Sequence, residues 1–162
     1  MKEFVRAALQ TMSCLFRKCA NYFSILAGAV KNRRPVKVAA AILEKDGKIL
    51  VARRRKLDRM GGKWEFPGGK IEEGETPEQG LERELKEELD IETKTGEFFC
   101  SSRFEYMHVP LEILAYRSRY ISGSIKLREH DDAAWVSPAE LGNYDFVTGD
   151  ISIIKKLQQT FR

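Results

Sequence analysis

Three glutamates stand close together in a segment with a helical pattern, and their spacing suits the binding of a cation. Glu84, Glu87 and Glu88 would fall on one face of a helix, within an arc of about 100°. Like charges at these spacings repel by roughly 0.2–0.5 kcal/mol per pair. A hard divalent ion such as Mg²⁺ would offset that repulsion and could also engage substrate phosphates. The spacing is therefore compatible with a metal-assisted phosphate reaction.

A solvated acidic face is the simpler interpretation of the same residues, and most acidic helix faces are of that kind. Two ion pairs along the helix could stabilise such a face, Glu82 with Lys86 and Arg83 with Glu87. The glutamates alone favour the solvated face, so the elements that would position them matter.

The helix that carries the glutamates has clear start signals. Thr76 suits the N-cap, Pro77 the first helical position, and Gln79 completes a capping box. We expect the helix to end near residue 89. An apolar stripe beside the acids would fix the direction in which they point. It consists of Leu81, Leu85 and Leu89.

The remaining pattern predicts strands and one further helix. Residues 36–43 and 48–52 form a hairpin around the turn at 45–47, and a short strand at 64–66 is broken by Pro67 and two glycines. Further strands are expected at about 97–104, 111–120 and 133–136, before a last helix at about 152–159. Strands mixed with two main helices indicate an α/β sandwich.

The segment GKIEEGETPEQGLERELKEELDI, residues 69–91, resembles the Nudix box. It has the Gly, the Glu six residues later, and then Arg-Glu-apolar-x-Glu-Glu; only the final Gly of the box is replaced, by Asp90. Together with the preceding Trp-Glu-Phe-Pro-Gly and the first hairpin, the likeness to the MutT branch covers roughly residues 36–160. Fixed identities at so many spaced positions make chance a poor explanation.

The resemblance implies a fold and an activity. The expected fold is a Nudix α/β/α sandwich with a mixed β-sheet over residues 35–162. The expected reaction is Mg²⁺-dependent hydrolysis of a nucleoside triphosphate, either an ordinary or an oxidised one, to the monophosphate and pyrophosphate, as in nucleotide-pool sanitation; Mn²⁺ could replace Mg²⁺. The substrate is the expected partner, and whether the chain is a monomer or a dimer stays open.

The resemblance also implies metal ligands. Glu84, Glu87 and Glu88 would bind the metal with a carbonyl of Gly68 or Gly69. Glu84 is our choice for the general base, and Arg83 would orient Glu75 or the acids. A further metal ligand is expected at Glu129, whose alternative reading is a simple loop carboxylate; it also rivals Glu84 as base.

Substrate contacts are expected from two groups of residues. Arg54 and Lys70 suit phosphates, and Phe66, Phe146 and Asp150 stand where MutT-like chains contact the base. An ionised Asp150 only accepts hydrogen bonds, so it would suit the exocyclic amine of cytosine or the NH groups of an oxidised guanine. The two cations could equally be surface residues, and Asp150 could instead cap the last helix.

Asp90 replaces the family glycine at the end of the acidic helix. A left-handed backbone is usual there, and Asp tolerates it better than most residues. We expect a small stability cost, so Asp90→Gly should raise the melting temperature.

Composition narrows the remaining choices. The 162 residues, 43% hydrophobic and 32% charged, suit one domain. Residues 1–34 carry seven basic residues and one acidic residue, a net charge of +6, whereas the rest carries −2. That distribution does not predict a nucleic-acid polymer as partner. The cysteines Cys14, Cys19 and Cys100 predict neither a disulfide framework nor a zinc site, which fits a cytoplasmic setting.

Residues 1–34 are expected to form a basic extension that is helical or loosely ordered. Two alternatives are an amphipathic helix on a membrane surface and a signal-like export segment.

The alternative functions are compatible with the same fold. The substrate could be a dinucleotide, ADP-ribose or capped RNA, or the chain could be a nucleotide sensor without catalysis, although a pure binder has no need of a water-activating acid cluster.

Overall fold

The computed structural model describes residues 35–106 and 108–160, so the prediction for residues 1–34 lies outside the described residues. Residues 37–104 and 111–160 belong to one compact unit, which contains all the candidate site residues. In the described part of the chain, no helix is both long enough and apolar enough to cross a membrane.

The unit is built on a seven-stranded sheet with the order β3-β2-β1-β6-β5, in which β4 also pairs with β1 and β7 with β2. The strands are β1 (Val36–Lys45), β2 (Lys48–Arg54), β3 (Trp64–Glu65), β4 (Gly68–Lys70), β5 (Ile91–Tyr106), β6 (Val109–Gly123) and β7 (His130–Val136). The helical segments are α2 (Pro77–Leu89), η1 (Pro138–Asn143), η2 (Thr148–Asp150) and α3 (Ile151–Thr160).

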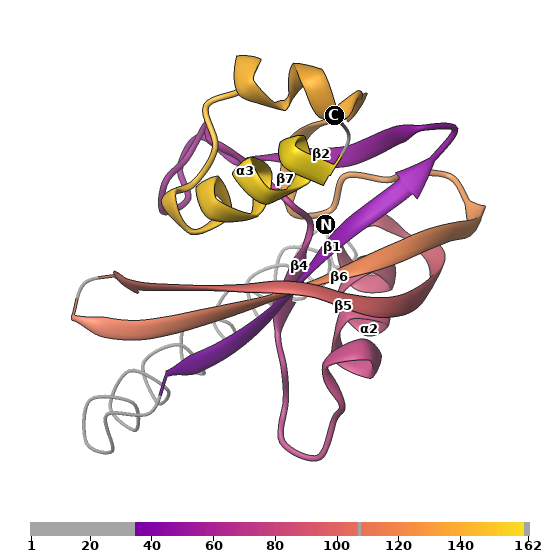
Figure 1. The fold of residues 1–162 in the computed structure, drawn as a ribbon. Helices are drawn as coiled ribbons and strands as arrows, with labels where there is room; N and C mark the ends of the chain where they lie inside the picture. Colours follow the sequence, from indigo (N-terminus) through magenta and orange to yellow (C-terminus); the bar gives the residue numbers. More distant parts are fainter. Residues whose placement is uncertain (1–34, 107, 161–162) are drawn as a thin grey trace, which may run out of the picture. The chain divides into compact units, whose positions relative to one another are not determined.

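Strand β1 shows why helices cover both faces of the sheet. Its side chains alternate between the faces, so Ala40 and Ile42 join one core cluster, whereas Ala39, Ala41 and Leu43 join the other. Helix α3 packs in the first cluster and the leucine stripe of α2 in the second, so the two helices lie on opposite sides of the strands (Figure 1). The expected α/β sandwich is present.

Helix α2 begins and ends as the sequence predicts. Thr76 caps it and forms a reciprocal capping box with Gln79, and Pro77 occupies the first turn. Asp90 ends the helix in the left-handed conformation, with φ 58° and ψ 33°. The start of the helix, and hence the rotation of its acidic face, is therefore fixed by local chemistry.

Most strands are longer than the sequence analysis predicts, whereas β3 ends one residue earlier than the short strand expected at 64–66. Strand β5 starts at Ile91, directly after Asp90, rather than near residue 97. The alternation there is polar-rich, with Ile91 and Thr95 buried and Glu92 exposed, so hydrophobicity alone misses it. Strand β7 starts at His130, not near residue 133, because the polar run before Ala133 is paired with β2.

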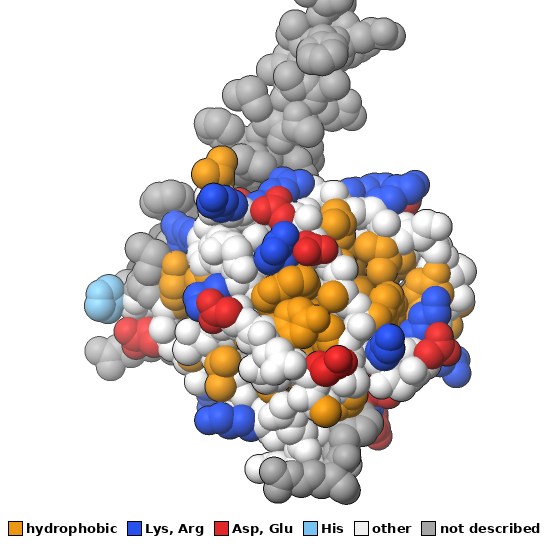
Figure 2. All heavy atoms as spheres, turned by 90° about the horizontal axis from the view of Figure 1, so that it is seen from above, with side chains coloured by type: hydrophobic (Ala, Val, Ile, Leu, Met, Phe, Trp, Pro, Cys, Tyr) orange, Lys and Arg blue, Asp and Glu red, His pale blue; other side chains and the backbone are white. Residues whose placement is uncertain are grey.

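Figure 2 shows the face seen from above in Figure 1. Apolar side chains gather near its centre, and positive and negative side chains alternate around them. Binding of a nucleic-acid polymer favours a continuous basic stripe. This face carries no such stripe among the described residues.

Candidate active site

The acids of α2 are not equally exposed. Glu84 and Glu88 are each 7% exposed, whereas the side chain of Glu87 is 53% exposed. Helix geometry explains the difference, because Glu84 and Glu88 lie next to the leucine stripe, whereas Glu87 lies on the outer side, about 60° from Glu84 and about 100° from Glu88. The fold thus buries two carboxylates beside the sheet and leaves the third at the rim.

The glycine backbone at Gly69 lies directly against the side chain of Glu84. Strand β4 pairs with β1 and places Gly69 opposite Ala39. A β-carbon on Gly69 would lie 2.4 Å from Cδ of Glu84, closer than atoms can approach. The glycine therefore makes room for the carboxylate, and Gly68 beside it adopts φ 153°, which favours glycine.

Arg83 holds the acids in position. Its Nε donates to Oε1 of Glu75 at 2.7 Å and its Nη2 to Oε2 at 3.0 Å. Its Nη1 donates to Oε1 of Glu84 at 2.9 Å. The same Nη1 lies 3.7 Å from Oε2 of Glu87. The hydrogen bonds that Arg83 donates to Glu75 and Glu84 raise the pKa of Arg83, and Arg83 in turn lowers the pKa of Glu75. The contacts expected of Arg83 are present.

The donor set fits a hard divalent cation. Mg²⁺ usually takes one or two protein carboxylates and completes its shell with water and substrate phosphates. Two buried carboxylates beside a glycine backbone meet that requirement. Within the described ranges, no group of three or more acidic, His or Cys side chains is placed to hold a metal ion.

Glu129 lies near the C-terminal end of the acidic helix. The backbone N–H of Arg128 donates to the carbonyl of Glu88 at 3.0 Å, and that of Lys126 to the carbonyl of Leu89 at 2.9 Å. These bonds satisfy carbonyls that a helix end leaves open. They also bring the loop that carries Glu129 beside Glu88, where the sequence predicts a further acid.

A second polar network joins Arg54, Glu65 and His130. Arg54 donates to Oε2 of Glu65 at 2.7 Å, and Nε2 of His130 lies 3.0 Å from Oε1 of the same carboxylate. Burial alone would raise the pKa of Glu65, but the hydrogen bond from His130 and the charge of Arg54 lower it overall. The charges of Glu65 and, more weakly, Glu88 raise the pKa of Arg54.

The proposed base-contacting residues meet in the core. Asp150 is 2% exposed, and its Oδ2 accepts a hydrogen bond from the backbone N–H of Phe66 at 2.8 Å. This bond crosses the fold, whereas the capping alternative expected a bond within the first turn of α3. Burial, with the nearby Glu65, raises the pKa of Asp150 to about 8. The rings of Phe66 and Phe146 pack 5.6 Å apart.

A model of the NUDIX domain matches residues 33–157 of the chain. The chain belongs to the Nudix family. Over 120 residues, this Nudix domain is 38% identical to the CTP pyrophosphohydrolase of Escherichia coli (strain K12), covering 74% of this chain and 89% of the relative. Over 127 residues it is 31% identical to the 8-oxo-dGTP diphosphatase of the same strain, covering 78% and 98%.

Solved structures agree with the sequence relatives. The solution structure of the Escherichia coli ORF135 protein superposes with a TM-score of 0.72 at 36% identity, covering 79% of this chain and 91% of that one. The resemblance to MutT-like Nudix proteins and the Nudix fold are thus confirmed. The chain is a hydrolase of phosphoric anhydride bonds.

Lys70 contributes its backbone to this Nudix site, because its carbonyl accepts from Arg83 at 3.2 Å. Its half-buried side chain leaves both the phosphate and the surface interpretation open.

The ion pairs expected for a solvated face of α2 are present only in part. Arg83 lies near Glu87, but Lys86 pairs with Glu92 at 2.7 Å and Glu82 with Lys94 at 3.4 Å.

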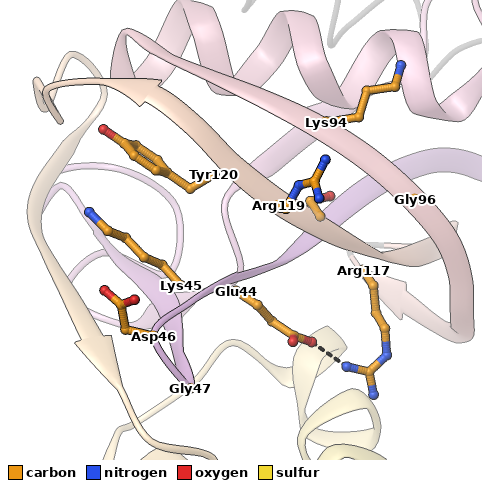
Figure 3. A pocket seen from close by; sticks show the side chains of 10 residues that line it. Glu44, Lys45, Asp46, Gly47, Lys94, Gly96, Arg117, Arg119 and Tyr120 are labelled. Atoms are coloured by element: carbon orange, nitrogen blue, oxygen red, sulfur yellow. Dashed lines mark hydrogen bonds and ion pairs between the residues drawn. The ribbon is translucent and has the colours of Figure 1, made fainter.

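A separate hollow of about 600 Å³ lies away from the candidate residues, and none of them lines it. Figure 3 shows Arg117 directed towards Glu44 and Lys45 beside Tyr120. Arg117 forms an ion pair with Glu44, and Nζ of Lys45 lies 4.5 Å from the centre of the Tyr120 ring. In this Nudix domain the buried acids and their partners, and not the size of a cavity, indicate the candidate active site.

Sequence reasoning missed Glu65 and His130 as members of the site. Glu65 carried a signal, since it is a charged residue between Trp64 and Phe66 just before the glycine turn. His130 carried none that spacing could show, because its partner is 65 residues away.

Proposed function

We propose that this Nudix hydrolase converts a nucleoside triphosphate to the monophosphate and pyrophosphate in a Mg²⁺-dependent reaction of the MutT type. The observation that carries the proposal is the burial of Glu84 and Glu88 against the sheet, with Arg83 bound to Glu84 and Gly69 leaving room for its carboxylate. Nothing in the folding of a helix requires two buried like charges, which destabilise the isolated fold.

The metal would be held by Glu84, Glu87 and Glu88 with a carbonyl of Gly68 or Gly69, and Glu129 would assist. When bound, Mg²⁺ or Mn²⁺ would neutralise charge on the phosphate oxygens. Glu84 is the proposed general base; the alternative base is Glu129. The base takes a proton from the attacking water as the new P–O bond forms, and the bond between the attacked phosphorus and the oxygen that bridges the α- and β-phosphates breaks.

Arg54 and Lys70 are the proposed phosphate contacts. A guanidinium forms bidentate bonds with phosphate oxygens. The Arg54 side chain is 32% exposed, so it can reach a ligand while its Nη1 stays hydrogen-bonded to Glu65.

The cellular setting that we propose is the cytoplasm, where nucleoside triphosphates are plentiful.

The base contacts are proposed for Asp150, Phe66 and Phe146. A pKa near 8 keeps Asp150 mostly protonated at neutral pH, which changes the expectation drawn from an ionised Asp. Its carboxyl group can then donate as well as accept. This combination suits the N3 and N4 edge of cytosine, and the pyrimidine preference is in keeping with the name of the 38% identical relative. An 8-oxo-guanine nucleotide is the second candidate, on the name of the 31% identical relative.

A panel of substrates with Mg²⁺ tests the proposal. It contains CTP, dCTP, 8-oxo-dGTP and the common nucleotides, together with a dinucleotide, ADP-ribose and capped RNA. We expect pyrophosphate and a monophosphate from at least one triphosphate, with the highest kcat/KM in that class. Higher kcat/KM on a diphosphate derivative would contradict the proposed substrate class, and nucleotide binding without product would instead support a sensor.

A further inference from the structure

His130 is a buried histidine that the proposed reaction does not use. Its side chain is only 3% exposed, and Nε2 lies 3.0 Å from Oε1 of Glu65. Within the described residues, Nδ1 is buried without a hydrogen-bond partner. A fold that needed only volume here could use an apolar side chain, which would leave no polar atom unsatisfied. The bond to Glu65 is therefore the feature that requires a histidine.

The same carboxylate holds Arg54 with its other oxygen, at 2.7 Å from Nη1. Arg54 is fixed on its far side as well, because Nε donates to the carbonyl of Arg59 at 2.7 Å. Glu65 thus has one oxygen for His130 and one for Arg54. Without His130, its carboxylate could rotate, and Arg54 would follow it.

The strand register brings these residues together. Strands β2 and β7 pair regularly until Arg53 and Asp132, and then the register shifts so that Arg54 faces His130. Asp131 is the extra residue, and its carboxylate accepts from the backbone N–H of Lys56 at 2.9 Å. A bulge of this kind redirects side chains at a site, and here it places the His130 ring behind Glu65.

We infer that His130 is a positioning residue: through Glu65 it fixes the guanidinium of Arg54 in the orientation that receives a substrate phosphate. The inference rests on the proposed function, since the phosphate contact of Arg54 belongs to it. His130 itself does not touch the substrate. Its Nε2–H donates to the ionised carboxylate of Glu65, which only accepts.

Two amide variants of His130 test the inference. Gln places an N–H donor at about the distance of Nε2, whereas Asn places it one bond short, so the pair differs by a single methylene group. We expect His130→Asn to lower kcat/KM on the preferred triphosphate about tenfold and His130→Gln to stay within about threefold of the wild type. Melting temperatures of both variants show whether each is folded at the assay temperature.

The same two variants are then made in an Arg54→Ala background. Because His130 acts through Arg54, His130→Asn should change kcat/KM there by less than about twofold. An equal loss in both backgrounds, or equal activity of the Asn and Gln variants, would overturn the inference while leaving the proposed function intact. Absence of triphosphate hydrolysis by the wild-type chain would overturn the proposed function and the inference with it.

Discussion

The carboxylate of Glu84 fills the space in which a side chain on Gly69 would begin. A β-carbon on Gly69 would lie 2.4 Å from Cδ and 2.7 Å from each oxygen of Glu84. One residue lies on α2 and the other on β4, so the contact joins the acidic helix to the glycine turn. The position of the proposed catalytic acid therefore depends on residue 69 being a glycine.

Gly69→Ala should displace Glu84 and lower turnover. The added methyl group overlaps the carboxylate, so the acid must rotate away, and we expect a loss of tenfold or more in kcat. The matched control is Gly142→Ala, where the nearest atom would be 3.6 Å away. Pyrophosphate release by both variants gives the comparison. Full activity of Gly69→Ala would mean that the position of Glu84 does not matter.

Magnesium should stabilise the wild-type chain through Glu84 and Glu88. At ten times the dissociation constant, binding contributes about 1.4 kcal/mol, which raises the melting temperature by roughly 3–6 °C. The double variant Glu84→Gln with Glu88→Gln should melt higher than the wild type without metal, because the buried repulsion is gone, and should lose the shift. A metal-induced shift that persists in the double variant would place the ion elsewhere.

Asp150→Asn should stabilise the fold in a pH-dependent way. The folded pKa of about 8 lies above the unfolded value of about 3.9, so the native state binds the extra proton between these values. Stability from this group is complete below the unfolded pKa and falls as pH rises towards 8. Asn needs no proton and keeps an acceptor for Phe66. We expect its melting temperature to exceed that of the wild type by about 3 °C or more at pH 8.

Thermal melts of Asp150→Asn between pH 4 and pH 8 provide the check. The difference from the wild type should shrink steadily as the pH falls. A difference that is constant across this range, or that grows at low pH, would show that Asp150 is not held protonated in the folded protein.

Asp90 forms ion pairs that the sequence did not reveal. Its Oδ2 lies 2.8 Å from Nζ of Lys126, and its Oδ1 lies 3.2 Å from Nη2 of Arg128. Lys126, with the other cations, lowers the pKa of Asp90. These pairs oppose the gain expected from Asp90→Gly. Since salt screens exposed charges, the melting temperature of Asp90→Gly relative to the wild type should rise with salt concentration.

Asp90→Asn is the control for that measurement. It loses the same charge but keeps a residue that tolerates the left-handed backbone. In 1 M salt we expect Asn to match the wild type and Gly to melt higher. If Gly melts no higher than Asn at any salt concentration, the backbone argument for position 90 is wrong.

Local signals account for what the sequence predicted correctly. The start of α2 depends on Thr76, Pro77 and Gln79, which contact each other, so neighbouring residues contain the information. The end at Asp90 follows in the same way. The rotation of the acidic face then follows from the leucine stripe, which is why the common direction of the acids could be predicted, although the burial of Glu84 was not.

Long-range pairing accounts for what the sequence could not show. His130 meets Glu65 only because β7 pairs with β2 and the register shifts beside Arg54. Asp150 gains its raised pKa from burial next to Phe66, 84 positions away. Neither relation leaves a periodic trace, since side chains from strands and loops far apart in the chain create it.

The most direct test of the account compares pyrophosphate release by the wild type with three variants of α2 in the presence of Mg²⁺. Glu84→Gln and Glu88→Gln should each lower turnover by about tenfold or more, the scale of a lost base or ligand. Glu82→Gln, the same change on the far side of the helix, where Glu82 binds Thr95, should leave turnover near the wild-type value. Near-normal turnover in both Glu84→Gln and Glu88→Gln would contradict the catalytic role of the buried acids.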